Sequence, residues 1–321
     1  ILLLSPYSWS NEHNAVTEFT LDNGLTLIVK EDHRAPVATF MIWYRVGSAD
    51  EPPGQTGVSH MLEHMMFKGT NTRTYLQIAG EMEGVGASIN ANTGSERTCY
   101  FFVAPAEVLS KVLPVYADAI NNSLLDADEW EKERLVILEE LKMYEDMPRF
   151  VVSDRLETTM FNPQVGVIGS RETIQAIRTD DMRQLISRWY RPSNMVISAA
   201  GGIEHEEVVD AAEKYFGSRE ESGEESDWPK LPEKSSKRIV GVCRQTDQVN
   251  LAIGFRSFGL SHPDFSALRI MNDILGGKMS SRLFEEVREK RGLAYSVNSR
   301  VHPFTDTGYL EMKAGVSPEK A

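Results

Sequence analysis

Two kinds of apolar pattern alternate along this chain. Short runs rich in β-branched and aromatic residues are typical of strands, and stretches with an apolar residue every three or four positions are typical of amphipathic helices. Up to residue 217, strands are predicted at Leu25–Val29, Val37–Val46, Ala87–Ala91, Arg97–Ala104 and Asn194–Gly201. Helices are predicted at Gly57–Phe67, Thr72–Met82, Pro105–Ile120, Asp128–Tyr144, Val151–Phe161, Asp180–Tyr190 and Glu206–Phe216. The alternation indicates an α/β architecture.

The pattern stops at a polar segment and then begins again. Between Ser218 and Ser236 the chain is dominated by Glu, Ser, Gly, Pro and Lys, which predicts an interdomain linker. Beyond it, strands are predicted at Ile239–Cys243, Val249–Arg256, Leu293–Val301 and Thr307–Val316, and helices at about Phe265–Leu275 and Ser281–Lys290. The run Tyr295-Ser296-Val297-Asn298 echoes Ser88-Ile89-Asn90, so we interpret the second part as a divergent copy of the first.

The predicted organisation is two related domains. The first covers residues 15–217, the linker residues 218–236, and the second residues 237–321. Ser317 followed by Pro318 and Glu319 is typical of a helix start, so we expect the second domain to be truncated.

Composition narrows the class of protein. A chain of 321 residues with 41% hydrophobic and 25% charged residues is typical of a soluble globular protein. No run approaches the roughly eighteen apolar residues of a membrane helix, so no membrane span is expected. The formal net charge of −13 argues against nucleic acid or an anionic membrane surface as partner.

The cysteines and the first residues give weaker indications. Cys99 and Cys243 lie far apart in apolar, strand-like runs, where free buried thiols are expected. Residues Ile1–Leu4 followed by Ser8-Trp9-Ser10 are similar to the end of a secretory signal. This similarity predicts a periplasmic or otherwise exported protein, with a cytoplasmic location as the alternative.

One motif in the first domain carries chemistry. His60, Glu63 and His64 follow the order H-x-x-E-H within the predicted helix Gly57–Phe67. Residues three and four apart share a helix face, so the two imidazoles and the carboxylate converge on one point. Two imidazoles at this spacing clamp a divalent metal, which needs a third protein ligand and an open position for water. Glu63 is then the candidate base for that water, and the alternative is a pair of partly buried, hydrogen-bonded histidines.

The helix predicted from Asp128 to Tyr144 offers the third ligand. Its candidates are Glu133, Glu139 and Glu140. Glu133 and Glu140 are two helical turns apart and share a face, whereas Glu139 points about 100° away. The helical geometry favours Glu140 as ligand with Glu133 beside the site, and a solvated acidic face is the alternative.

Together these residues resemble the insulinase/pitrilysin family of zinc metallopeptidases, the inverzincins. Within it the chain is similar to short bacterial subunits of the type of the mitochondrial processing peptidase β subunit. The resemblance covers the chain from about Val16 onward. It rests on four segments, His60–Thr70, Glu133–Glu140, Ile168–Glu172 and Gly276–Phe284. It implies an α/β (α+β) metallohydrolase fold of the processing-peptidase type, with two related domains that are each a mostly antiparallel sheet flanked by helices.

The resemblance also implies roles for residues of the first domain. His60, His64 and Glu140 match the ligands of one Zn²⁺ per chain, and Glu63 matches the general base. Glu133 matches an acidic residue that supports a ligand without binding the metal.

Further residues match positions that contact substrate in the family. Asn90 and Ala91 match an exposed strand edge on which the peptide substrate is laid. Arg288 and Tyr295, from the second domain, match a pair that contacts the substrate and its transition state. The second copy carries Asn272 and Asp273 where the first has its motif, so only the first is expected to hold metal.

The expected function is that of a zinc-dependent endopeptidase acting on peptides or unfolded segments. The resemblance implies a homodimer, or a heterodimer with a related subunit. A non-catalytic structural or partner subunit of a peptidase-like complex is the alternative, and an intact metal motif argues against it. A small-molecule lyase or hydrolase with the same metal clamp is a third interpretation, which the duplicated second half argues against.

Overall fold

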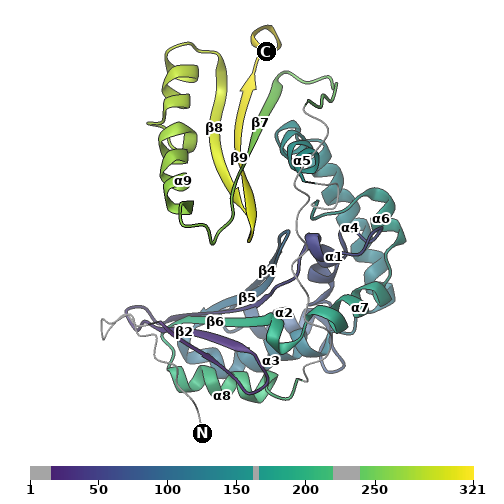
Figure 1. Cartoon of the computed structure of the whole chain (residues 1–321). Helices are drawn as coiled ribbons and strands as arrows, with labels where there is room; N and C mark the ends of the chain where they lie inside the picture. The colour runs from purple at the N-terminus through teal and green to yellow at the C-terminus, as the bar shows by residue number, and fades with distance from the viewer. Residues whose placement is uncertain (1–15, 162–165, 220–238) are drawn as a thin grey trace. The chain divides into compact units, whose positions relative to one another are not determined.

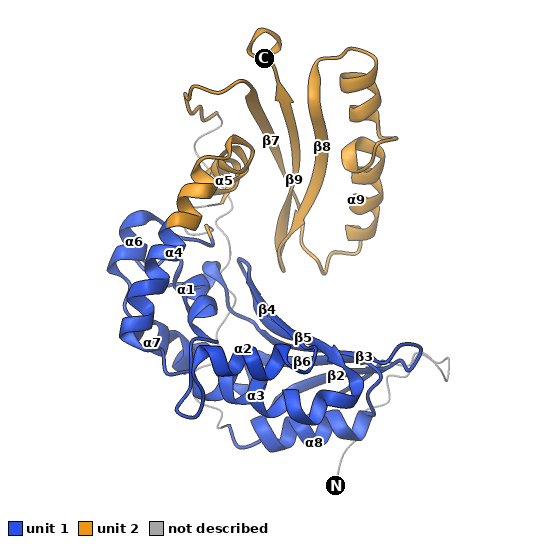
Figure 2. Cartoon of the chain, turned by 180° about the vertical axis from the view of Figure 1, so that it is seen from behind, with its two compact units in different colours: residues 1–138, 167–227 blue, residues 139–166, 228–321 orange. Residues whose placement is uncertain are grey.

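The structure is a computed structural model that describes residues 16–161, 166–219 and 239–321. The signal-like first residues and most of the predicted linker lie outside the described residues. The chain divides into two compact units, one of residues 1–138 and 167–227 and the other of residues 139–166 and 228–321 (Figure 2). Residues 139–166, which the sequence prediction placed in the first domain, thus group with the second unit.

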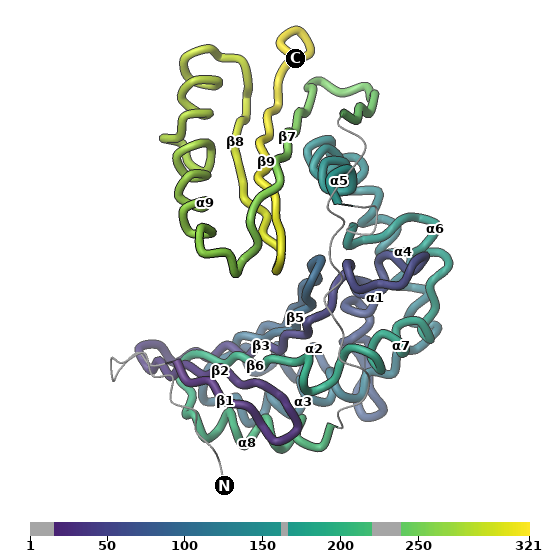
Figure 3. Tube along the Cα trace, in the orientation of Figure 1, coloured from purple at the N-terminus to yellow at the C-terminus, as the bar shows by residue number. Residues whose placement is uncertain are grey.

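The first unit contains a six-stranded sheet in the order β1-β2-β6-β3-β5-β4. Its strands are β1 (Thr17–Thr20), β2 (Thr26–Glu31), β3 (Val37–Tyr44), β4 (Ser88–Thr93), β5 (Thr98–Pro105) and β6 (Met195–Gly201). Neighbouring strands are antiparallel except β2 and β6, which are parallel and lie side by side although far apart in the sequence (Figure 3). The mostly antiparallel sheet is the predicted kind.

Helices cover one face of this sheet and its β4 end. They are η1 (Ser48–Asp50), α1 (Val58–Met65), α2 (Tyr75–Glu83), η2 (Ala106–Val108), α3 (Leu109–Asn122), α4 (Ala127–Glu145), α6 (Arg171–Ala176), α7 (Thr179–Trp189), η4 (Pro192–Asn194) and α8 (His205–Phe216). Figure 1 shows α3 and α8 on the same side of the sheet. The alternating strand residues Phe40, Ile42 and Tyr44 are buried. One face of β3 is therefore part of the core, as the alternation of a half-buried strand requires.

The second unit contains a three-stranded antiparallel sheet in the order β7-β9-β8. Its elements are α5 (Pro148–Met160), β7 (Val249–Phe258), α9 (Phe265–Asn272), η5 (Asp273–Gly277), η6 (Phe284–Glu289), β8 (Ala294–Pro303), β9 (Thr307–Val316) and η7 (Pro318–Lys320). Helix α5 lies so close to β7 that a Cβ on Gly254 would collide with Met160 Sδ. Phe161, Phe304 and Tyr309 form a small core beside this contact.

The two sheets share a topology. In each, one strand is followed by helical segments and then by a hairpin whose second strand pairs with the first, giving β3-β5-β4 and β7-β9-β8. This repetition agrees with the predicted relation between the two halves. The prediction of an α/β fold with sheets flanked by helices is confirmed.

Several sequence predictions are wrong. Residues 239–243 form no strand, and Ile239 is 92% exposed. The only described neighbour of β7 is β9, so this segment has no described strand to receive its backbone hydrogen bonds. Cys243 is consequently exposed, whereas Cys99 is buried and free as expected. The helix predicted over Ser281–Lys290 is present, with π geometry over Phe284–Glu289. The sequence analysis missed β1 and α6.

Among the described residues, no helix combines the length and the apolar character that crossing a membrane requires.

Candidate metal centre

The predicted metal helix is α1, a short amphipathic segment. Val58, Met61, Leu62 and Met65 are fully buried and fix one face of the helix against the first unit. The opposite face carries the H-x-x-E-H residues. Because α1 has only eight residues, it depends on such packing to form at all.

The two motif histidines lie next to each other on this face of α1. Their Nε2 atoms lie 3.3 Å apart. Two nitrogens bound to one tetrahedral zinc at about 2.0–2.1 Å would be separated by roughly 3.3–3.4 Å. The imidazoles of His60 and His64 are therefore already spaced as a zinc pair.

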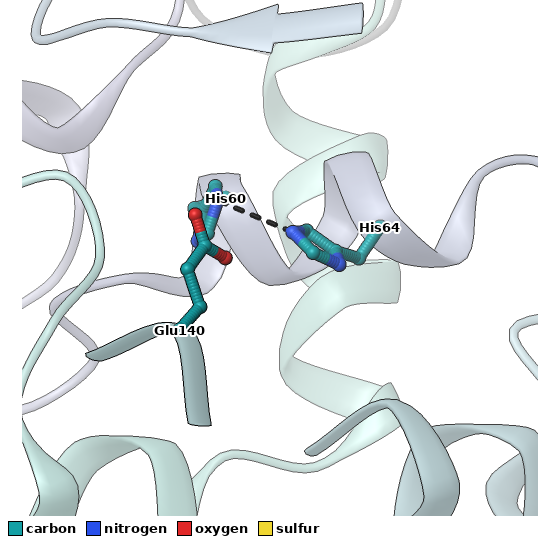
Figure 4. A group of neighbouring side chains, drawn as sticks. All are labelled: His60, His64 and Glu140. Carbon is teal, nitrogen blue, oxygen red and sulfur yellow. Dashed lines mark hydrogen bonds between the residues drawn. The ribbon is translucent and has the colours of Figure 1, made fainter. Parts of the chain in front are cut away.

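Glu140 completes a set of three ligand atoms. One atom each from His60, His64 and Glu140 lies within 4.8 Å of the other two. Figure 4 shows the carboxylate of Glu140, from α4, beside the imidazole of His60. Glu139 is exposed and pairs with Lys142, so the two neighbouring carboxylates diverge as the helical geometry predicts. The limit between the units falls inside α4, just before these two residues. Two nitrogens and one carboxylate oxygen form a donor set that fits zinc.

Glu133 lies two turns before Glu140 on α4 and orients His64. Its Oε1 accepts a hydrogen bond from His64 Nδ1 at 2.9 Å, and its Oε2 pairs with the ammonium group of Lys68. Burial alone would raise the pKa of Glu133, but the bonds from His64 and Lys68 outweigh burial and hold that pKa below its ordinary value. An ionised carboxylate on Nδ1 leaves Nε2 of His64 as the metal-facing nitrogen. Lys68 was not singled out from the sequence, although it lies within the motif segment.

The candidate base, Glu63, is held by a residue that the sequence analysis missed. Thr93, the last residue of β4, donates its hydroxyl to Glu63 Oε2 at 2.5 Å. No sequence spacing links positions 63 and 93, so only the three-dimensional structure reveals this contact between α1 and β4. Thr93 lies two residues beyond the end of the predicted strand Ala87–Ala91.

The start of α1 is capped by Glu51, a further residue that the sequence analysis missed. Its two carboxylate oxygens accept the backbone N–H groups of Gly57 at 2.6 Å and Ser59 at 2.8 Å. Gly57 has φ +99°, and a Cβ there would meet the carbonyl oxygen of Ile168 at 2.7 Å. Burial raises the pKa of Glu51 to about 8, against the hydrogen bonds that lower it. The loop at Ile168, which carried part of the family resemblance, thus packs against the start of the metal helix.

Asn90 and Ala91 lie on β4, the last strand in the order of the six-stranded sheet. β4 pairs with β5 on one side only among the described residues. Asn90 Oδ1 accepts the backbone N–H of Ala91 at 2.8 Å. The structure thus places both residues on a sheet edge, as predicted.

Arg288 and Tyr295 lie together in the second unit. Arg288 is on the π-helical segment η6, with its guanidinium 6.0 Å from the centre of the Tyr295 ring and 4.7 Å from that of Phe284. Tyr295, on β8, is 77% exposed. Their predicted contact with substrate stays a prediction.

A second group of potential metal ligands is a weaker candidate for a metal site. Glu31, His33 and Glu204 also bring one ligand atom each within 4.8 Å, but all three are exposed. Glu31 already accepts the backbone N–H of His205 at 2.6 Å. Exposed carboxylates of this kind are ordinary surface features.

Comparison with known proteins identifies the family of this chain. Residues 26–167 match the family described as Insulinase (Peptidase family M16), and residues 176–321 match the Peptidase M16 inactive domain. The uncharacterized zinc protease YmxG of Bacillus subtilis is 37% identical over 94% of this chain and 73% of its own length. The uncharacterized zinc protease SCO5738 of Streptomyces coelicolor is 37% identical over 95% of this chain and 68% of its own.

A solved structure has a similar fold. The crystal structure of a protease from Helicobacter pylori matches with a TM-score of 0.87 and 26% identity, over 95% of this chain and 76% of that one. Sequence and structure both lead to one assignment. The chain belongs to the insulinase family, peptidase family M16.

Proposed function

We propose that this protein is a zinc-dependent endopeptidase that hydrolyses peptides or unfolded segments. The observation that carries the proposal is the spacing of the donor set. His60 Nε2 and His64 Nε2 lie 3.3 Å apart, and the carboxylate of Glu140 lies within 4.8 Å of them. A structural pair of histidines needs no carboxylate at that distance and no base on the same helix face.

The residues on α1 and α4 have separate roles in the proposed peptide hydrolysis. Zinc held by His60, His64 and Glu140 would act as a Lewis acid and activate water at neutral pH. Glu63 takes a proton from the attacking water and returns it to the leaving amine. Glu133 keeps His64 in the tautomer that binds metal.

The peptide would bind as an added strand along β4. Asn90 and Ala91 lie on that edge, and backbone pairing there selects extended chains rather than particular sequences. Arg288 and Tyr295 would donate to the negative charge that develops on the peptide carbonyl. The proposal therefore includes broad selectivity for extended peptides.

The proposal also includes a dimer, either of two copies or with a related subunit. Family resemblance supports it. Light scattering of the purified protein tests it, and a monomer at all concentrations would contradict it.

Metal content and peptide cleavage test the proposed function together. We expect about one zinc per chain by elemental analysis in the wild type, a loss of zinc in Glu140→Gln, and retention in the control Glu139→Gln. Glu63→Gln should keep zinc and lose cleavage of a quenched peptide library. Zinc without cleavage would support the non-catalytic partner subunit instead. A wild type that binds no zinc would refute the metal centre itself.

A further inference from the structure

Glu63 forms a hydrogen bond with Thr93 on β4, a residue to which the proposed reaction assigns no role. Thr93 donates its hydroxyl to Glu63 Oε2 at 2.5 Å, and this bond joins α1 to the end of β4. Hydrogen bonds to an ionised acceptor are shorter and stronger than those between neutral groups. The hydroxyl therefore fixes where one oxygen of the carboxylate lies.

The position of this carboxylate matters for proton transfer. A general base must come within about 2.6–3.2 Å of the group whose proton it takes. The Glu63 side chain reaches that point through several rotatable bonds, so its orientation is not set by α1 alone. A carboxylate offers about four acceptor positions, of which the Thr93 hydroxyl takes one, at Oε2. Thr93 can thus restrict the orientation of the Glu63 carboxylate without occupying all of its acceptor positions.

Thr93 is itself anchored to the segment that caps α1. The turn after β4 is fixed where the backbone N–H of Ser48 donates to Gly94 O at 3.1 Å. Three residues after Ser48, Glu51 accepts the N–H of Gly57 at the start of α1. Residues 48–51 therefore hold both the strand end that carries Thr93 and the helix that carries Glu63.

We propose that Thr93 is a positioning residue for Glu63. It acts through the carboxylate and does not touch the metal. The inference rests on the proposed function, because it assigns Glu63 as the base. Strand β4 would then have two roles. Its edge at Asn90 and Ala91 would bind the peptide, and its last residue, Thr93, would align the base.

Two variants of Thr93 separate this role from a merely structural one. Thr93→Val keeps the branched shape and strand propensity but removes the hydroxyl, and Thr93→Ser keeps the hydroxyl. With zinc content unchanged in both, we expect kcat to fall roughly 10- to 100-fold in Thr93→Val, with KM nearly unchanged. Thr93→Ser should stay within roughly threefold of the wild type. A wild-type kcat in Thr93→Val, or an equal loss in Thr93→Ser, would overturn the proposal.

A binding measurement decides the same question without turnover. Acetohydroxamate binding to the cobalt-loaded protein is followed by visible absorption in the wild type, Thr93→Val, Glu63→Gln and the double variant. A hydroxamate donates a hydrogen bond to the base, so we expect Kd to rise roughly 3- to 10-fold in Thr93→Val. In the Glu63→Gln background the threonine change should add nothing, because Thr93 acts through Glu63.

The two measurements fail in different ways. Additive losses in the binding cycle would overturn the role of Thr93 and leave the peptidase proposal standing. Non-additive losses without any peptide cleavage would refute the peptidase proposal and retain the contact. Absence of both cleavage and hydroxamate binding in the cobalt-loaded wild type would count against both.

Discussion

Replacing Glu133 by Gln tests how far the metal centre depends on the residue that orients His64. The change keeps the shape of the side chain and removes its charge. In the wild type, His64 Nδ1 lies 2.9 Å from Glu133 Oε1. The amide oxygen of Gln can still accept this hydrogen bond, but it polarises the imidazole less than a carboxylate does. Loss of such a partner typically weakens metal binding about 10–100-fold. Because the hydrogen bond itself survives, we expect the lower end, about tenfold or 1.4 kcal/mol.

Glu133→Ala should lie at the upper end of that range. It removes the acceptor altogether and leaves the ammonium group of Lys68 without the carboxylate it contacts. We expect zinc affinity to fall roughly 100-fold, about 2.7 kcal/mol.

Competition with a coloured chelator at pH 7 measures these affinities. The matched control is Glu139→Gln, the same chemical change on the same helix at a side chain that is 77% exposed. It should bind zinc as the wild type does. Wild-type affinity in Glu133→Gln, or an equal loss in Glu139→Gln, would refute the idea that Glu133 acts through His64.

Three further predictions concern stability. Burial raises the pKa of Glu51 from 4.5 to about 8 and the pKa of Asp50 from 3.8 to about 7. Between these values the folded state keeps protons on the two carboxyl groups that the unfolded state releases. Stability from this source is lost as pH rises from about 5 to 8, and Glu51→Gln should flatten the dependence of Tm on pH. Gly57→Ala should lower stability by more than about 2 kcal/mol in denaturant unfolding, because a Cβ would meet Ile168 O at 2.7 Å. Gly54→Ala, also at positive φ but with nothing within 4 Å, should cost only about 1 kcal/mol, and equal losses would contradict the steric argument. Removing metal with a chelator should lower Tm, and added zinc should restore it; an unchanged Tm would argue against a metal bound by the folded state.

The candidate ligands could be predicted because helical periodicity converts spacing into geometry. His60 and His64 lie one turn apart on α1, and their Nε2 atoms do approach each other. Glu133 and Glu140 lie two turns apart on α4, and Glu139 diverges into solvent. Each of these statements depends on one regular element at a time. The sequence therefore contained enough to choose Glu140 over Glu139.

The rest depends on contacts between elements, which no local pattern encodes. Thr93 reaches Glu63 only because β4 ends beside α1, and Glu51 reaches Gly57 across an irregular segment. The strand expected over residues 239–243 fails for a related reason. Its apolar residues suit a strand, but a strand also needs a neighbour for its backbone, and Ile239 is instead 92% exposed.

These contacts explain how so short a helix can carry the centre. An isolated helix of eight residues is unstable in water, so α1 cannot position a base and two imidazoles by itself. Glu51 supplies the cap that Gly57 lacks, Glu133 fixes His64 from α4, and Thr93 fixes Glu63 from β4. Each of these bonds comes from a different element of the first unit. The precise geometry of the centre therefore comes from the surrounding structure. Single changes outside the H-x-x-E-H motif should affect its two functions separately. Changes at Glu133 should weaken metal binding, and changes at Thr93 should slow proton transfer.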